Sequence, residues 1–285
     1  MLNTKVEVLK KETVKIYRMS TLDNQNNPIM WVSAFLIDGL LIDFGHYHAK
    51  DEFINLLNFN DIEKAVLSHQ HEDHFGACYD LVNKYNLPIF TTKEIAFLVG
   101  LKIRLPSERT YAWGIPKPFV AKELTNLKEI KTTKATFEII ASPGHCYTLI
   151  SFFHKKKRLL FSTDAFVSKN QSVIFNWEDA LLMIETLEKF IKLKPKFLFL
   201  ENGSLATLDD VTELINYWTS IKEQAENLYN QGIKTRLIVK HIFGKESFLK
   251  RATSGAMSRE NLIKSLLKLP PVKDKEIIRL NYKNN

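Results

Sequence analysis

Four candidate metal ligands lie within six positions of this chain, directly after a short strand pattern. The segment Ala65-Val66-Leu67 is apolar and partly β-branched, as expected of a strand enclosed on both faces, and a helical period resumes from Phe75. The residues between them read Ser-His-Gln-His-Glu-Asp-His, so we expect a strand-to-helix turn. A turn of this kind can direct several side chains at one point, and the sequence therefore predicts a metal site.

The spacing within this turn suits one ion or two. His69 and His71 can direct their rings at one ion, while Asp73 and His74, at the start of the next helix, can address a second. Imidazole with carboxylate suits zinc, so we expect one or two zinc ions, with iron or manganese as alternatives. Two ions about 3.5–4 Å apart can share a hydroxide and polarise a carbonyl or phosphoryl oxygen. A histidine-rich surface turn is the simpler explanation, but four ligands in this order disfavour it.

Two further candidates each follow an apolar strand pattern. Residues 137–142 lead into Pro143-Gly144-His145, and residues 158–163 lead into Asp164. His145 would complete a three-histidine set with the two alternate histidines of the turn. The two oxygens of Asp164 can bridge two cations. Either segment alone can be an ordinary turn, but together with the first run they define a ligand set.

These residues resemble the metallo-β-lactamase superfamily, whose signature is His-x-His-x-Asp-His, then Pro-Gly-His, a strand-end Asp and a final His. The elements that correspond are His69, His71, Asp73, His74, His145 and Asp164. Residues 41–45 resemble the family's early strand and turn beneath the metals, with Asp43 in a supporting role. The resemblance covers roughly residues 5–205. The resemblance implies an α/β (α+β) fold, namely a four-layer αββα sandwich with the metals at one edge. It also implies a hydrolase, because most members of the family are hydrolases.

The chain departs from the family pattern at the last ligand. Similar proteins carry Gly-His-x-Gly after the strand that occupies residues 196–200 here, whereas this chain continues Glu201-Asn202-Gly203-Ser204. Asn202 stands where the histidine is expected and offers a neutral carbonyl oxygen. Glu201 offers a carboxylate if the turn swings, and His241 could reach in from a helical stretch near the C-terminus. The first metal position, with its three histidines, is intact, and the second is open.

Length and composition describe an ordinary folded enzyme. The 285 residues, 45% of them hydrophobic, suffice for one large or two small domains with a real core. We expect a catalytic domain over residues 1–205 and a helical extension over 206–285 that packs on the core or forms a homodimer seam. There is no membrane-spanning apolar run and no N-terminal signal core, so we expect a cytoplasmic protein without a membrane partner. Cys78 and Cys146 need no disulfide in that compartment.

The net charge of +8 raises the alternative of a nucleic-acid partner. The basic residues are scattered, however, and the run Lys155-Lys156-Lys157-Arg158 is typical of a solvated hairpin tip. We therefore expect a small-molecule substrate. Nuclease or phosphodiesterase activity of the same fold is the minor alternative, which a salt-dependent binding slope would expose.

Residues 101–120 contain three prolines and no clear period, so we predict a loop. In it, Tyr111 and Trp113 would wall the substrate pocket, and Arg104 or Arg109 would meet an anionic group. A surface crossing packed by its own aromatic side chains would give the same pattern.

Three helix starts are predicted further along the chain. Asn176 would cap a helix that runs to about Leu193, and Thr207 and Ser258 would begin two more.

These features predict a zinc-dependent metallo-hydrolase in which a metal-bound hydroxide attacks an ester-like carbonyl, a thioester or a lactone. Asp73 would be the catalytic residue that orients the nucleophile and accepts its proton, and Asp164 would hold the metal. His46 and His48 would line the entrance or lie on the surface. The same residues would also suit a one-metal, iron-dependent oxidative protein, or a non-catalytic member that only binds a ligand.

Overall fold

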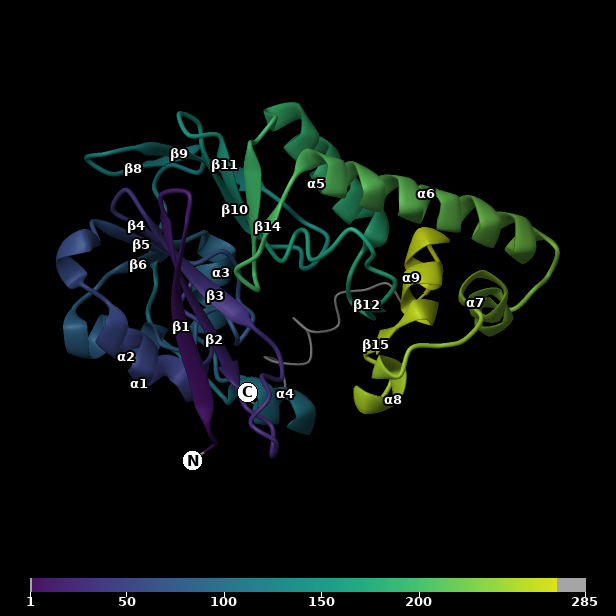
Figure 1. Ribbon diagram of the computed structural model, residues 1–285, viewed down its shortest axis with the longest axis horizontal. Coiled ribbons are helices and arrows are strands. Elements are labelled where there is room, and N and C mark those ends of the chain that lie inside the picture. Colours follow the sequence, from purple (N-terminus) through teal and green to yellow (C-terminus); the bar gives the residue numbers. More distant parts are fainter. Residues whose placement is uncertain (1, 271–285) are drawn as a thin grey trace.

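The computed structural model describes residues 2–270, whose strands form two mixed sheets. The first sheet runs antiparallel from β1 to β4 and parallel from β4 to β7 (Figure 1). Its strands are β1 Thr4–Lys11, β2 Val14–Thr21, β3 Val32–Ile37, β4 Leu40–Ile42, β5 Lys64–Val66, β6 Ile89–Thr91 and β7 Lys122–Glu123.

The second sheet has the order β14-β13-β11-β10-β9-β8 and is antiparallel except between β11 and β13. Its strands are β8 Glu129–Lys131, β9 Thr136–Ala141, β10 Ile150–His154, β11 Leu159–Thr163, β13 Phe197–Leu200 and β14 Leu205–Ala206. A separate antiparallel pair joins β12 Ile174–Phe175 to β15 Met257–Ser258. The basic run 155–158 lies between β10 and β11, as a hairpin tip should.

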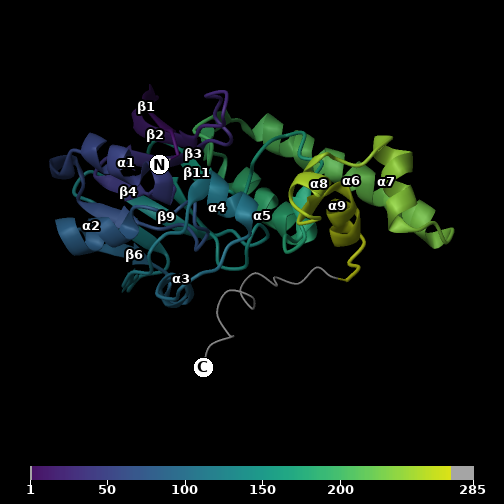
Figure 2. The ribbon, with the colours of Figure 1, turned by 90° about the horizontal axis from the view of Figure 1, so that it is seen from below.

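Helices cover the outer face of each sheet, so the predicted four-layer αββα fold is confirmed. The helical elements are η1 Tyr47–Ala49, α1 Lys50–Leu56, η2 Phe59–Asp61, α2 Cys78–Tyr85, α3 Lys93–Val99, α4 Ser107–Trp113, α5 Ala180–Leu193, α6 Leu208–Asn230, α7 Thr235–Phe243, α8 Leu249–Ala252 and α9 Arg259–Leu266. Figure 2 shows α1 to α3 at one end of the molecule and α6 to α9 at the other. None of the helices in residues 2–270 combines the length and apolar character that a membrane crossing requires.

The layers follow from the alternation of side chains along strands that are buried on both faces. In β3, Ala34 and Leu36 point to the cluster under α1 to α3, while Phe35 and Ile37 point between the sheets. There Phe35 meets Phe161 of the second sheet with ring centroids 5.5 Å apart. The register of β3 is therefore fixed on both sides, because a shift by one residue would exchange the two sets.

The helical region is held to the second sheet by an apolar stripe on α6. Its buried members are Val211, Leu214, Trp218, Ile221 and Ala225, as the three-and-four spacing predicts. The division at residue 205 into a catalytic domain and an extension stays a prediction.

Two of the three predicted helix starts are correct. Thr207 and Ser258 are N-caps, and Thr207 forms a reciprocal capping box with Asp210. The predicted cap at Asn176 is wrong, because the side chain of Asp179 accepts from the backbone N–H groups of Leu181 and Leu182 and α5 begins at Ala180.

The predicted loop over residues 101–120 is interrupted by a short helix, α4. The helix begins directly after Pro106 and ends at Gly114, whose φ is 78°. Arg109 and Trp113 lie four residues apart on its buried face. The loop prediction did not use this four-residue spacing, which is a helical signal within an otherwise proline-rich stretch.

Candidate metal centre

The histidine-rich run forms the predicted turn between β5 and α2. Two contacts pin it against the loop that follows β4: the N–H of Phe44 donates to the carbonyl of His74, and the N–H of Gly76 donates to the carbonyl of Gly45. A Cβ at Gly76 would lie 2.1 Å from the backbone of His46, so only glycine allows this approach. The turn is thus a fixed platform for its side chains.

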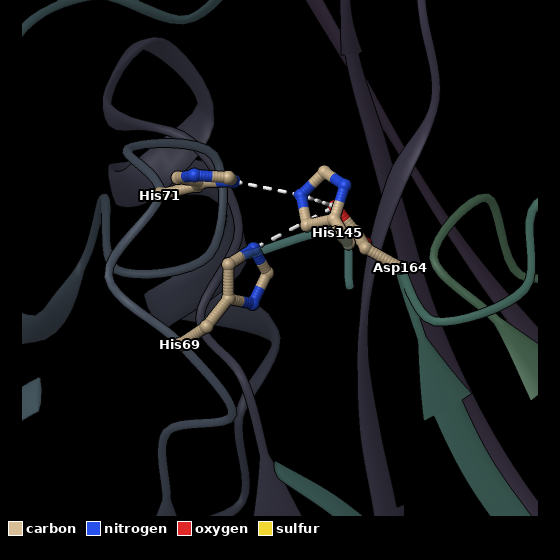
Figure 3. Close-up of side chains that lie close together, drawn as sticks. All are labelled: His69, His71, His145 and Asp164. Carbon is tan, nitrogen blue, oxygen red and sulfur yellow. Dashed lines mark hydrogen bonds and ion pairs between the residues drawn. The ribbon is translucent and has the colours of Figure 1, made fainter. Parts of the chain in front are cut away.

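Three histidines and one aspartate converge at the sheet edge, as Figure 3 shows for His69, His71, His145 and Asp164. One potential ligand atom from each lies within 4.8 Å of the others, and all four residues are buried. The Nε2 of His145 lies 2.8 Å from Nδ1 of His71 and 3.1 Å from Oδ2 of Asp164. This is the donor set of a buried His/Asp metal-binding cluster.

Asp164 faces two groups of side chains at once. Its Oδ2 lies 3.6 Å from Nε2 of His69 and 3.1 Å from Nε2 of His145. Its Oδ1 lies 3.2 Å from Nε2 of His74, which is itself 3.8 Å from Oδ2 of Asp73. The six residues predicted from the sequence are therefore brought together, with Asp164 between the two groups.

Buried partners orient three of the imidazoles through Nδ1. Asp43 lies 2.9 Å from Nδ1 of His74 and accepts from the hydroxyl of Ser68, which contacts Nδ1 of His69. Glu178 lies 2.5 Å from Nδ1 of His145. With the proton of each ring on Nδ1, the Nε2 atoms face the cluster as potential ligands.

The Pro-Gly-His turn allows Glu178 to reach His145. Gly144 has a φ of 137°, and a Cβ there would lie 2.4 Å from the side chain of Met183 and 2.7 Å from its backbone N. The carbonyl of Gly144 also accepts from the N–H of Asp179. Glycine thus lets the start of α5 lie against the turn, which places Glu178 beneath the imidazole.

Unsatisfied polar atoms show that this residue set fits a cation. His69 Nε2 and Glu201 Oε2 are buried without a hydrogen-bond partner among the described residues. His74 Nε2 and Asp164 Oδ1 face each other at 3.2 Å as an ion pair but likewise make no hydrogen bond there. Buried polar atoms of this kind are otherwise costly. A divalent ion bound among them would satisfy imidazole nitrogens and carboxylate oxygens together.

Charge at the cluster is balanced by protons on histidine. Burial disfavours charge on His74 and His145, but Asp164 and further carboxylates outweigh it and hold the pKa of each imidazole well above its ordinary value. Burial and the neighbouring His74 hold the pKa of His69 well below its ordinary value. Burial would raise the pKa of Asp164, yet His74 and His145 hold it well below. A bound cation would replace these protons.

Of the three candidates for the last ligand, Glu201 lines the cavity, whereas Asn202 and His241 do not. The side-chain oxygen of Asn202 accepts from the N–H of Ser204 and closes the local turn. His241 is exposed on α7, which contacts α6 and α9. Glu201 lines the same cavity as Asp164, and burial together with the charge of Asp164 holds the pKa of its carboxyl well above the ordinary value.

A cavity of about 290 Å³ opens beside the cluster. Site residues on its wall are His71, Asp73, His145, Asp164, Glu178 and Glu201. Apart from Arg109, Ser168 and Ser172, the remaining wall is apolar or amide-bearing and comes from distant segments: Met30, Trp31, Val32, Trp113, Val167, Asn170, Gln171, Val173, Phe175 and Met257. The site therefore has room for a small substrate with apolar parts.

Several residues predicted at the pocket lie elsewhere. Trp113 lines the cavity, but Tyr111 and Arg104 are exposed and are not on its wall. His46 is fully buried, and Nε2 of His48 lies 3.1 Å from the carbonyl oxygen of Thr110, so neither lines the entrance. His46 and His48 follow the loop after β4, which packs against the histidine-rich turn and not at the pocket.

Arg109 lines the cavity, but its guanidinium is paired with a carboxylate of the protein. Its guanidinium contacts Glu72 through Nε at 2.6 Å and through a second nitrogen at 2.8 Å. The rings of Trp113, Phe175 and Trp177 surround it at 5.3–5.7 Å. This pair and Glu178 were missed from the sequence, because residues 37 and 33 positions apart give no local signal of contact.

Comparison with known proteins gives the same fold. The family model described as the metallo-β-lactamase superfamily matches residues 32–201. The Bacillus subtilis protein named "Probable metallo-hydrolase YybB" is 24% identical over 147 residues, which are 49% of this chain and 63% of that protein. The chain thus spans less than two thirds of the length of the curated relatives it matches.

Two solved structures resemble the whole arrangement. The match to a beta-lactamase domain protein from Burkholderia ambifaria covers 92% of this chain and 88% of that protein, with 14% identity and a TM-score of 0.67. The match to the metallo-beta-lactamase family protein TTHA1429 from Thermus thermophilus covers 88% of this chain and 90% of that protein, with 15% identity and a TM-score of 0.56. At these identities the likeness shows the fold.

Proposed function

The chain belongs to the metallo-β-lactamase superfamily, and on that premise we propose that it is a zinc-dependent hydrolase of an ester-like carbonyl, a thioester or lactone. The observation that carries the proposal is the buried His/Asp cluster at the wall of a largely apolar cavity. The relative named as a probable metallo-hydrolase supports the reaction class.

The bound metal would supply a water of lowered pKa and would draw charge from the carbonyl oxygen. Residues of the chain supply the rest. His69, His71 and His145 would hold the ion in a fixed position, because Ser68 and Glu178 orient two of the rings. The fixed geometry lowers the cost of bringing water and carbonyl together.

Asp73 is the residue that we assign to proton transfer. It lines the cavity next to His71, and its Oδ2 is 3.8 Å from the nearest nitrogen of His74. A carboxylate in that place can orient the attacking water and accept its proton, a contribution of about 10²–10⁴ in rate for general bases. Asp73→Asn should therefore lower turnover while metal content is retained at the three-histidine position.

The charge on the cavity wall favours a carbonyl substrate over a phosphodiester. The wall carries the carboxylates of Asp73, Glu178 and Glu201. Among the described residues, the one Lys or Arg side chain on the wall is Arg109, which is already paired with Glu72. An anionic substrate would therefore depend on the bound metal for positive charge, because no further arginine or lysine is placed to meet a phosphate.

Metal analysis and a substrate panel test the proposal. Protein stripped with a chelator should regain hydrolysis of thioesters or lactones on addition of zinc, and His71→Ala and Asp164→Ala should lose it while circular dichroism shows a folded chain. Hydrolysis of phosphodiesters alone would favour nuclease activity. One iron per chain, with no hydrolysis, would favour oxygen chemistry.

A further inference from the structure

We propose that Glu201 is the last ligand of the centre and that it makes the second metal position an oxygen-rich site for a hard divalent cation such as Mn²⁺. The inference rests on the proposed metal-dependent function, and it concerns what this chain does differently at the position where its relatives are expected to carry histidine.

Strands β11 and β13 are parallel neighbours, with Thr163 opposite Leu200. The next residue of each strand is a carboxylate, Asp164 after β11 and Glu201 after β13. Because parallel strands end at the same edge of a sheet, the two side chains leave the backbone side by side. Both line the cavity at the cluster.

One carboxylate oxygen of Glu201 lacks the contacts that a structural carboxylate normally has. This oxygen, Oε2, is buried and has no hydrogen-bond partner among the described residues. Asp80, a carboxylate buried on α2, contrasts with it, because Lys50 and Lys84 contact its two oxygens at 3.0 and 2.7 Å. An unpaired buried oxygen beside Asp164 and His74 is therefore in the right place to bind a cation.

The donor atoms divide into two sets with different chemistry. One set is His69, His71 and His145 with Oδ2 of Asp164, and it is rich in nitrogen. The other set is His74 with Asp73 and Oδ1 of Asp164. Glu201, on the wall of the same cavity as Asp73 and Asp164, would make this set rich in oxygen. Imidazole-rich sites suit zinc, whereas carboxylate-rich sites suit manganese and magnesium.

Charge reinforces the difference. With Glu201 in place, the two positions share three carboxylates, Asp73, Asp164 and Glu201, where a final histidine would leave two. The added negative charge strengthens binding of a hard, strongly hydrated cation, whose bonding is mainly electrostatic. Zinc still binds most sites more tightly than manganese in absolute terms, so the measurable quantity is the ratio of the two affinities.

The experiment uses full-length protein stripped of metal and loaded with one equivalent of zinc. Mn²⁺ is then titrated and the free ion is read from its electron paramagnetic resonance signal, and a parallel titration with zinc gives the ratio of affinities. We expect one Mn²⁺ per chain in the wild type. We expect at least a tenfold loss of Mn²⁺ affinity in Glu201→Gln, and a shift of the ratio of at least tenfold toward zinc in Glu201→His.

Asp80→Asn is the matched control, because it neutralises a buried carboxylate that two lysines already contact and should leave Mn²⁺ binding unchanged. Thermal unfolding shows whether each variant is folded, and Glu201→His gives a readout that loss of folding cannot imitate. Unchanged Mn²⁺ affinity in Glu201→Gln, or no second ion in the wild type, would overturn this inference and leave the hydrolase proposal standing. Failure of the wild type to bind even the first zinc would overturn the proposed function.

Discussion

His46 offers a test of how burial controls the acid stability of this fold. The side chain is fully buried, and neither ring nitrogen has a hydrogen-bond partner among the described residues. Burial, with a smaller contribution from the neighbouring His48, lowers the pKa of His46 to about 3. The imidazole is therefore neutral in the folded protein over the whole range in which an unfolded chain would gain a proton.

The magnitude follows from proton linkage. Below the unfolded pKa of about 6.5, the unfolded chain binds a proton at this position and the folded chain does not, so stability falls as the pH is lowered. Against a folded pKa of about 3, the loss is about 0.8 kcal/mol at pH 6 and about 2 kcal/mol at pH 5. His46→Leu removes this loss and also removes two unsatisfied buried nitrogens, so its stability at pH 7 should equal or exceed that of the wild type.

The assay is urea unfolding of metal-free protein at pH 7, 6 and 5, in the presence of a chelator. The free energy of unfolding of His46→Leu should exceed that of the wild type by an amount that grows by about 2 kcal/mol from pH 7 to pH 5. His241→Leu, at an exposed histidine of α7, should show no such growth. If His46→Leu and the wild type lose stability in parallel, the assignment of a buried neutral imidazole is wrong.

The metal centre and the buried Arg109 pair allow three more tests. Asp43→Asn should weaken zinc binding by about 10–100-fold, because Asp43 orients His74 directly and His69 through the hydroxyl of Ser68; an unchanged dissociation constant in a competition titration would contradict this. Filling both metal positions with zinc at pH 7 should release about two protons, one from His145 and one from His74, whose pKa values are raised, and binding should weaken as the pH falls. Calorimetry in two buffers of different ionisation enthalpy measures the number, and zero release would refute it. Arg109→Ala should cost about 3–5 kcal/mol of stability, because the buried carboxylate of Glu72 loses the guanidinium that contacts both of its oxygens. Chemical unfolding measures the loss, and a value below about 1 kcal/mol would contradict a stabilising buried pair.

The parts of the site that could be predicted from sequence are those carried by local patterns. The ligands of the first turn lie within six positions, and His145 and Asp164 each end an apolar strand, so spacing and strand pattern predicted their convergence. The three-and-four spacing of apolar residues on α6 likewise indicates which face of that helix is buried, because periodicity reports burial. The strand β3 carries no such signal, because it is buried on both faces.

The parts that could not be predicted depend on contacts between distant segments. Glu178 supports His145 only because Gly144 lets α5 approach the turn, and nothing in the sequence near Glu178 indicates that role. The choice of Glu201 over Asn202 depends on strand register and on which side chain is used to close the local turn. The sequence gives no sign of the role of Glu178 and does not choose the last ligand. Three-dimensional packing determines both.

The two sheets contribute to one ligand set from opposite sides of the sandwich. Residues 69–74 follow a strand of the first sheet, whereas His145, Asp164 and Glu201 follow strands of the second. A cation held at this edge would therefore join the halves of the molecule, and an ion present at about 100 times its dissociation constant would add about 2.7 kcal/mol to the free energy of unfolding. Separation of the sheets and release of the ion would then be a single event, so the lifetime of the folded chain would depend on how much metal its surroundings supply.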